Sequence, residues 1–178
     1  MIIRHGEKPD GSNQGFDPDG TLDSSSLTQA GYARARNLVK VFDPPAPGSP
    51  RPGLARPAAI YAASATDAGE GLRTRETVAP LAQQLGITVN TEFGKGDETA
   101  MVDDVISGPG PTLICWQHGE IPDIADAFEN VTPTPPSSWP DDRFDVIWVF
   151  TKTADGWSFT QVPELASPGD SNSLIPSG

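Results

Sequence analysis

The sequence predicts an α/β fold, a three-layer sandwich in which a mostly parallel central sheet lies between helices. Short apolar runs bounded by glycine and proline alternate along the chain with segments of helical periodicity, which is the pattern of strand–helix–strand units. The run TLICW at 112–116 is continuously apolar, as expected of a strand buried on both faces. Two β-rich runs, 143–151 and 157–162, flank an Ala-Asp-Gly turn. They predict a hairpin that gives the sheet an antiparallel edge.

Two strands and two helices are expected in the first half of the chain. They are a strand ending at 2–3, a helix over about 28–42, a strand over 58–62 and a helix over 72–85. Thr28 is a suitable N-cap for the first helix, and Asp43, followed by two prolines, ends it. Gly86 follows the second helix in the usual C-terminal position. The polar and proline-rich stretches at 9–26 and 43–57 are predicted to be loops.

The second half continues this alternation. Its predicted elements are a short strand over 87–89, a helix from Asp97 to about 106, the buried strand 112–116, a short helix over 121–128 and the hairpin. Pro122 lies in the first turn of the short helix, where proline is tolerated. The proline-rich stretch 132–140 is predicted to be a loop. Residues 1–165 are therefore expected to form one domain, and the Ser-, Gly- and Pro-rich segment 166–178 a flexible tail.

Charge and hydropathy exclude several classes of function. The 178 residues include 12 basic and 24 acidic ones, a formal net charge of −12, which argues against binding to nucleic acid and disfavours anionic membranes. No apolar run approaches the roughly 20 residues needed to span a bilayer, and no signal-peptide pattern is present. The single cysteine, Cys115, excludes an internal disulfide. We therefore expect a cytoplasmic protein; its oligomeric state and the full extent of its N-terminus stay open.

Side chains suited to an anion site follow three of the predicted strands. The two histidines, His5 and His118, each follow a strand end, Arg4 precedes His5, and Arg73 begins the helix after strand 58–62. Ligands of open α/β sheets bind beyond the carboxyl ends of the strands, so we expect these side chains at one rim. Arginine guanidinium groups match phosphate oxygens in bidentate fashion. The sequence therefore predicts a local phosphate site in an otherwise acidic protein.

Four motifs occur in the order in which they occur in the histidine phosphatase superfamily, the group that includes the phosphoglycerate mutases. They resemble its RHGE signature at Arg4-His5-Gly6-Glu7, its L-T-x-x-G helix start at Leu27, Thr28 and Gly31, its S…R-x-x-x-T element at Ser64, Arg73 and Thr77, and its second-histidine motif at His118-Gly119. The third element carries an insertion over 66–71. The resemblance runs from Ile2 to about Phe128 and implies a phosphoglycerate mutase-like fold.

This resemblance implies catalysis without a metal or another cofactor. His5 would attack the phosphoryl group, while Arg4, Arg73 and His118 would hold its oxygens and balance their charge. An acid would protonate the leaving oxygen, and water would then hydrolyse the phosphohistidine. The residues agree with this, because two scattered histidines and one cysteine do not form a closed zinc site.

The general acid is the role that the sequence defines least. In the phosphoglycerate mutase-like branch it is a glutamate ahead of the helix that follows the second arginine, and Glu98 is the best positional match. Glu92 and Asp97 stay open as alternatives, with Glu120 a weaker one. The other branch has an aspartate directly after the second histidine, a position that Gly119 occupies here.

Two side chains are added as further candidates, Lys8 for positive charge at the pocket mouth and Ser64 for bracing its loop. Arg75 competes with Arg73 for the phosphate, although the Arg-to-Thr spacing favours Arg73. The expected function is hydrolysis of a phosphomonoester, either a small phosphorylated substrate or a phosphoprotein. A phosphomutase that uses the same site and a catalytically silent binding module with the same fold are the alternatives.

Overall fold

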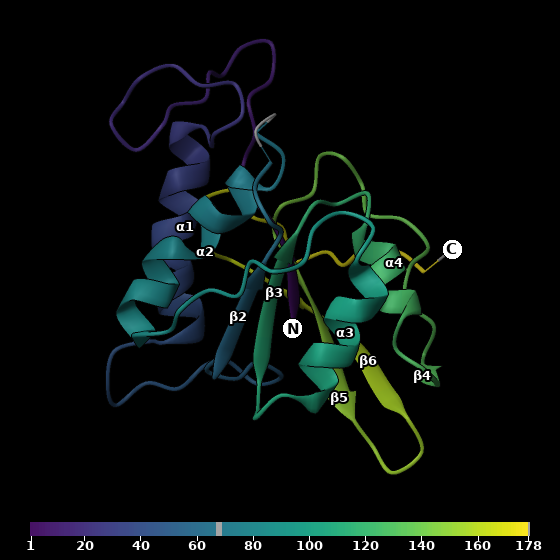
Figure 1. The fold of residues 1–178 in the computed structure, drawn as a ribbon. Coiled ribbons are helices and arrows are strands. Elements are labelled where there is room, and N and C mark those ends of the chain that lie inside the picture. Colours follow the sequence, from purple (N-terminus) through teal and green to yellow (C-terminus); the bar gives the residue numbers. More distant parts are fainter. Residues whose placement is uncertain (67–68, 178) are drawn as a thin grey trace.

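The computed structural model describes residues 1–66 and 69–177 (Figure 1). In chain order its elements are β1 (Ile2–Arg4), α1 (Gln29–Phe42), β2 (Ala59–Ala62), α2 (Leu72–Leu85), α3 (Glu98–Ser107), β3 (Thr112–Trp116), α4 (Ile121–Asp126), β4 (Val131–Thr132), β5 (Val146–Lys152) and β6 (Trp157–Pro163). The predicted α/β class is confirmed. Part of the predicted insertion at 66–71, and the last residue of the predicted tail, lie outside the described residues.

The strands form one mixed sheet in the order β2-β3-β1-β5-β6-β4. Parallel pairing joins β2, β3 and β1, with Ile60 opposite Leu113 and Ile2 opposite Ile114. Strand β5 runs antiparallel to both β1 and β6, so the predicted hairpin is confirmed. Both of its strands are internal, because β4 pairs in parallel with the far side of β6.

Two short segments differ from the prediction. Residues 87–89 form no strand, and the chain here makes a single bridge between Asn90 and Tyr61 of β2. Conversely, Val131 and Thr132 form β4 at the start of a stretch predicted to be a loop. Such short segments show no readable side-chain alternation. Whether they pair depends on the strand that the fold places beside them.

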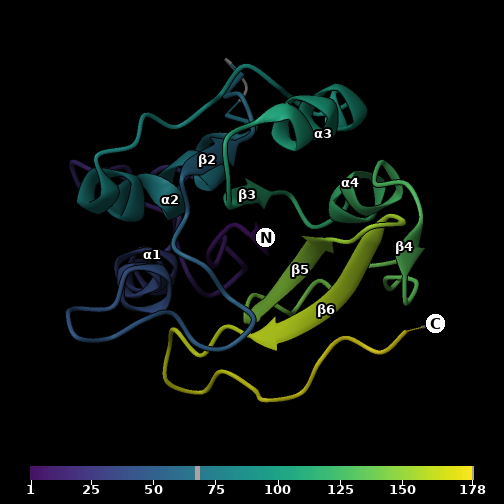
Figure 2. The same ribbon diagram turned by 90° about the horizontal axis from the view of Figure 1, so that it is seen from below.

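The sheet is apolar on both faces, and a pair of helices packs against each face (Figure 2). Ile2 and Trp116 belong to the core shared with α3 and α4, whereas Ile3 and Cys115 belong to the core shared with α1 and α2. Successive residues of a strand point to opposite faces, so Ile2 and Ile3 of β1 and residues 113–116 of β3 are all apolar. This explains the uninterrupted apolar run of β3.

The segment after β6 lies against the domain. Asp170 forms an ion pair with Arg34 of α1, and Ile175 is only 3% exposed. Gln161 of β6 donates to the carbonyl oxygen of Ile175 over 2.8 Å. The stretch predicted to be a flexible tail thus makes defined contacts through much of its described length. None of the helices in the described part of the chain combines the length and apolar character needed to cross a bilayer.

Candidate active site

Strands β1 and β3 deliver the two histidines to the same edge of the sheet. The strands are parallel neighbours with Arg4 opposite Trp116, and the backbone N–H of His5 donates to the carbonyl oxygen of Trp116 over 3.2 Å. A pocket of about 280 Å³ opens there. Its lining residues are His5, Gly69, Glu70, Gly71, Arg73, Thr74, Lys95, Gln117, His118, Gly119 and Glu120. The predicted convergence of His5, Arg73 and His118 is therefore present in the structure.

The imidazole of His5 is held in one tautomer. Its Nδ1 lies 2.7 Å from the carbonyl oxygen of Gly6, an acceptor, so Nδ1 carries the proton and Nε2 is left with a free lone pair. The residue is 2% exposed. The pKa of His5 is lowered from 6.5 to about 3, mainly by burial and also by the nearby charges of Arg4, Arg73 and His118, against the hydrogen bond to Gly6. The imidazole of His5 is therefore neutral at any physiological pH.

Close backbone packing holds the turn after His5. A Cβ atom on Gly6 would lie 3.0 Å from the Cα of Gly31, and one on Gly31 would lie 2.7 Å from the carbonyl oxygen of Glu7. The N–H of Gly6 donates to Oγ1 of Thr77 over 2.8 Å, and this hydroxyl in turn donates to the carbonyl oxygen of Arg73 over 2.7 Å. The RHGE, L-T-x-x-G and R-x-x-x-T motifs thus meet in space.

Arg4 is fully buried and faces the loop that precedes β5. Its Nη1 donates to the carbonyl oxygens of Asp141 over 2.6 Å and Arg143 over 3.0 Å, and its guanidinium carbon lies 3.8 Å from the centre of the Phe144 ring. Among the described residues, Nε and Nη2 of Arg4 have no hydrogen-bond partner. Burial lowers the pKa of Arg4 to about 10, so it stays charged at neutral pH. Arg4 lies behind the pocket rather than in its lining.

Arg73 lines the pocket from the first turn of α2. Its Nη2 donates to the carbonyl oxygen of Ser24 over 3.0 Å, and its buried Nε has no partner among the described residues. Burial lowers its pKa. Arg75 is exposed and is not among the lining residues. The structure therefore brings Arg73, and not Arg75, to His5.

His118 is oriented by a residue that the sequence analysis missed. Its Nε2 lies 2.5 Å from Oδ1 of Asp141, in the loop that also accepts from Arg4. Burial and the charge of Arg4 lower the pKa of His118, while Asp141 opposes this shift. The acidic pair at 141–142 carries no strand or helix signal, and only the folded loop brings it to the second histidine.

The acidic residues that line the pocket do not include Glu98, the best positional match for the general acid. Glu98 is 7% exposed, and its carboxylate accepts from the indole Nε1 of Trp116 over 3.1 Å and from the N–H of Gly96 over 2.9 Å. It is not among the lining residues, whereas Glu120 and Glu70 are. Glu120 forms a 2.5 Å ion pair with Lys95. Lys95 and Glu70 are lining residues that the sequence analysis did not select.

The remaining sequence candidates lie around the pocket without lining it. Asp97 accepts from the N–H of Gly94 over 2.9 Å, and Glu92 is exposed. Ser64 donates its N–H to the carbonyl oxygen of Phe93 over 2.8 Å. Lys8 is half-buried in the loop after β1. Ser64 therefore holds its loop through its backbone N–H.

Neither a metal cluster nor a known relative defines the site further. Within residues 1–66 and 69–177, no three His, Cys, Asp or Glu side chains are grouped so as to hold a metal ion. In comparison with known proteins, no family model and no curated protein matches the sequence.

Proposed function

We propose that this protein hydrolyses a phosphomonoester through a phosphohistidine on His5, and that it belongs with the histidine phosphatases of phosphoglycerate mutase-like, three-layer fold. The observation that carries this proposal is the state of His5. Its Nδ1–H donates to the carbonyl oxygen of Gly6, which leaves an unprotonated Nε2 in a pocket shared with Arg73 and His118. A buried neutral imidazole beside cationic groups is suited to attack on a phosphoryl group.

The chemistry begins with in-line attack. The lone pair of His5 Nε2 forms a bond to phosphorus while the bond from phosphorus to the ester oxygen breaks. Arg73 and His118 stabilise the charge on the equatorial oxygens. Nδ1 keeps its proton and its hydrogen bond to the carbonyl oxygen of Gly6, and this acceptor stabilises the positive charge that builds on the ring. Water then attacks phosphorus, the bond to Nε2 breaks, and inorganic phosphate leaves.

We propose Glu120 as the group that protonates the leaving oxygen and then accepts a proton from water. It lines the pocket with His5, and Lys95 holds its carboxylate. Glu98 is less suited, because both of its carboxylate oxygens already accept hydrogen bonds at the start of α3. A single glutamate can serve in both steps, because the acid of the first step is the base of the second.

Hydrolysis is favoured over transfer to a second substrate by the size and openness of the site. The pocket of about 280 Å³ is small, and exposed Gly119 and Lys95 lie at its margin. Water therefore reaches the phosphohistidine easily, whereas a phosphomutase must exclude it. A phosphomutase would instead pass phosphate to an added acceptor alcohol faster than to water.

The test is turnover of p-nitrophenyl phosphate by the wild type and His5→Asn, with His118→Asn as a second site variant. We expect the wild type to release phosphate and to form an acid-labile phosphoenzyme. His5→Asn should lose both, and His118→Asn should keep the phosphoenzyme but form it more slowly. Circular dichroism checks that each variant is folded. Absence of turnover and of a phosphoenzyme in the wild type, over a panel of sugar phosphates, nucleotides and phosphopeptides, would leave a silent binding module.

A further inference from the structure

The buried guanidinium of Arg4 is held by backbone carbonyl groups. Its Nη1 donates to the carbonyl oxygens of Pro140, Asp141 and Arg143, over 3.3, 2.6 and 3.0 Å. Among the ion pairs of the described residues, none includes Arg4. A carbonyl oxygen accepts a hydrogen bond but carries no formal charge. These partners therefore fix the guanidinium without neutralising it, and its positive charge stays available to an anion.

The three acceptors belong to one short loop, residues 140–143, between β4 and β5. The loop lies outside any helix or strand, and the N–H of Arg143 donates to the carbonyl oxygen of Pro140 over 3.2 Å to close a turn. The same loop carries Asp141, whose carboxylate pairs with His118. A shift of this loop would therefore displace partners of two site residues at once.

The side chain of Arg143 ties this loop to two other parts of the chain. Its Nε donates to Oδ1 of Asp145 over 2.7 Å, and its Nη2 donates to the carbonyl oxygen of Ser173 over 2.7 Å. Asp145 is itself 8% exposed, and its Oδ2 accepts from the N–H of Ser171 over 2.7 Å. The planar fork of arginine holds two acceptors in a fixed relation, so Arg143 anchors the loop at two points.

The carbonyl group of Arg143 is placed from a further side. Its oxygen accepts from the indole Nε1 of Trp139 over 2.9 Å as well as from Nη1 of Arg4. Trp139 is 4% exposed and belongs to the core shared with α3 and α4. An acceptor held between a core indole and its own anchored side chain has little freedom to move. The donor that it receives is placed with it.

We propose that Arg143 is a positioning residue of the active site. Its side chain, tied to Asp145 and Ser173, sets the place of its own carbonyl group and, through it, that of the Arg4 guanidinium. The consequence for catalysis rests on the proposed phosphatase function, in which Arg4 supplies positive charge to the phosphoryl oxygens from behind the pocket. Arg143 is not among the lining residues, so it acts through Arg4 and touches no substrate.

The first test compares the kinetics of Arg143→Gln and Arg143→Lys with those of the wild type. Glutamine is too short to span both anchors, so the loop relaxes and Arg4 loses its fixed acceptors. The attraction between Arg4 and phosphate is present in the substrate and in the transition state alike, so its loss raises KM and leaves kcat little changed. We expect KM for p-nitrophenyl phosphate, and Ki for inorganic phosphate, to rise about tenfold, the scale of one hydrogen bond to a charged group. Lysine can reach one anchor and should restore part of this.

Hydrogen exchange at Arg4 tests its placement without reference to activity. In the ¹⁵N-labelled protein, the guanidinium signals of Arg4 can be assigned by their NMR contacts to the ring of Phe144, whose centre lies 3.8 Å from the guanidinium carbon. They should be protected from exchange in the wild type, because Arg4 is fully buried, and should lose protection in Arg143→Gln. Protection that stays unchanged would overturn the proposal whatever the activity.

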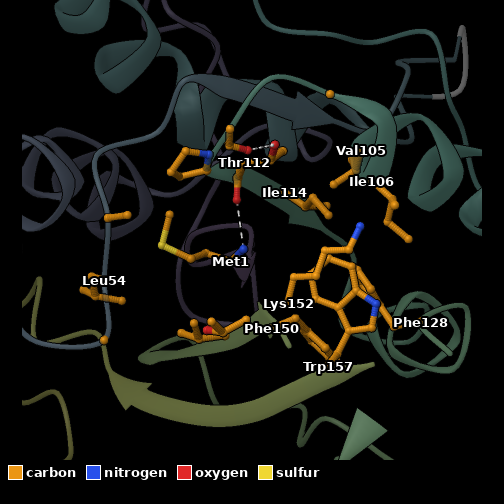
Figure 3. Close-up of a pocket in the computed structure, with 17 residues that line it drawn as sticks. Met1, Leu54, Val105, Ile106, Thr112, Ile114, Phe128, Phe150, Lys152 and Trp157 are labelled. Atoms are coloured by element: carbon orange, nitrogen blue, oxygen red, sulfur yellow. Dashed lines mark hydrogen bonds between the residues drawn. The ribbon is translucent and has the colours of Figure 1, made fainter. Parts of the chain in front are cut away.

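Thr112→Val is the matched control, at the other end of the sheet. Oγ1 of Thr112 donates to the carbonyl oxygen of Gly110 over 3.2 Å, in the wall of a cavity of about 470 Å³ at the amino end of β3 (Figure 3). This variant also removes a side-chain hydrogen bond to a backbone carbonyl group. It should lower the Tm without raising KM and without exposing Arg4 to exchange.

The remaining outcomes separate this proposal from the proposed function. Loss of protection at Arg4 with an unchanged KM would show that its placement does not serve the reaction, and equal rises in KM for Arg143→Gln and Thr112→Val would point to general destabilisation; either would overturn the proposal. Thermal unfolding shows which variants are folded, and Arg143→Lys replaces Arg143→Gln in both measurements if the latter is not. A wild type without turnover would contradict the proposed function instead, and the exchange at Arg4 would still decide whether Arg143 positions it.

Discussion

A Cβ atom on Gly31 would lie only 2.7 Å from the carbonyl oxygen of Glu7. This contact joins the turn after His5 to the first turn of α1. Because both partners are backbone, neither can rotate away. The position of His5 therefore depends on a glycine in a helix that contributes no residue to the pocket lining.

We expect Gly31→Ala to destabilise the protein and to lower its activity. Alanine in a helix is normally about 1 kcal/mol more favourable than glycine. If the free energy of urea unfolding nevertheless falls by about 1–2 kcal/mol, this net loss measures the clash. Phosphatase activity should fall by more than stability explains, because the turn carrying His5 shifts. Gly11→Ala is the control, since a Cβ there meets nothing within 4 Å. Equal stability of the two variants would contradict the packing argument.

The pH dependence of the reaction should reveal the unusual histidine. The pKa of His5 is lowered from 6.5 to about 3, so the imidazole is neutral, and nucleophilic, at any pH above that value. We expect no loss of kcat/KM from protonation of His5 between pH 7 and about 4. Rates from pH 3 to 8, with buffers of constant ionic strength, test this. An acidic limb near pH 6.5 that persists in the His118 and Glu120 variants would show that His5 titrates normally.

Glu120 and Glu98 can be separated by their dependence on the leaving group. Glu120→Gln should lower kcat by about 10²–10⁴-fold for an alkyl phosphate, and much less for p-nitrophenyl phosphate, whose leaving group needs no proton. Glu98→Gln weakens the contacts to Trp116 and Gly96 and should lower the Tm with little leaving-group dependence. The reverse pattern would assign the acid to Glu98, the best positional match in the sequence.

A buried carboxylate predicts how stability changes with pH. Glu164 shares Arg34 with Glu7 and Asp170, and burial raises its pKa from 4.5 to about 8, against the attraction of Arg34. Between these values the folded chain holds a proton that the unfolded chain releases. The stabilisation is therefore complete below pH 4.5 and is lost as the pH rises to 8.

We expect Glu164→Gln to remove this part of the pH dependence. The slope that disappears is at most about 1.4 kcal/mol per pH unit, measured as the free energy of urea unfolding at pH 5, 6, 7 and 8. Glu129→Gln, at an exposed position, is the matched control. Parallel curves for the wild type and Glu164→Gln would show that Glu164 stays ionised throughout.

Much of the candidate site could be predicted because its signals are local. Residues at strand ends reach one rim in any parallel sheet, so His5 and His118 could be selected from their positions. Arg73 begins the helix after a strand, and the Arg-to-Thr spacing selected it over Arg75. A choice between Glu98 and Glu120 could not be made, because both lie near helix starts and only the fold places Glu98 against Trp116 and Glu120 in the pocket lining. Asp141, Lys95 and Glu70 belong to loops, whose course depends on contacts distant in sequence.

The sequence determined the order of strands and helices, the caps at Thr28 and Gly86, and the burial of β3, because apolar periodicity and turn chemistry act over a few residues. The tertiary structure alone decided that 87–89 forms no strand and that β4 extends the sheet. Such features depend on which segments become neighbours, and neighbours in the sheet can be more than a hundred residues apart, as Ile2 and Ile114 are.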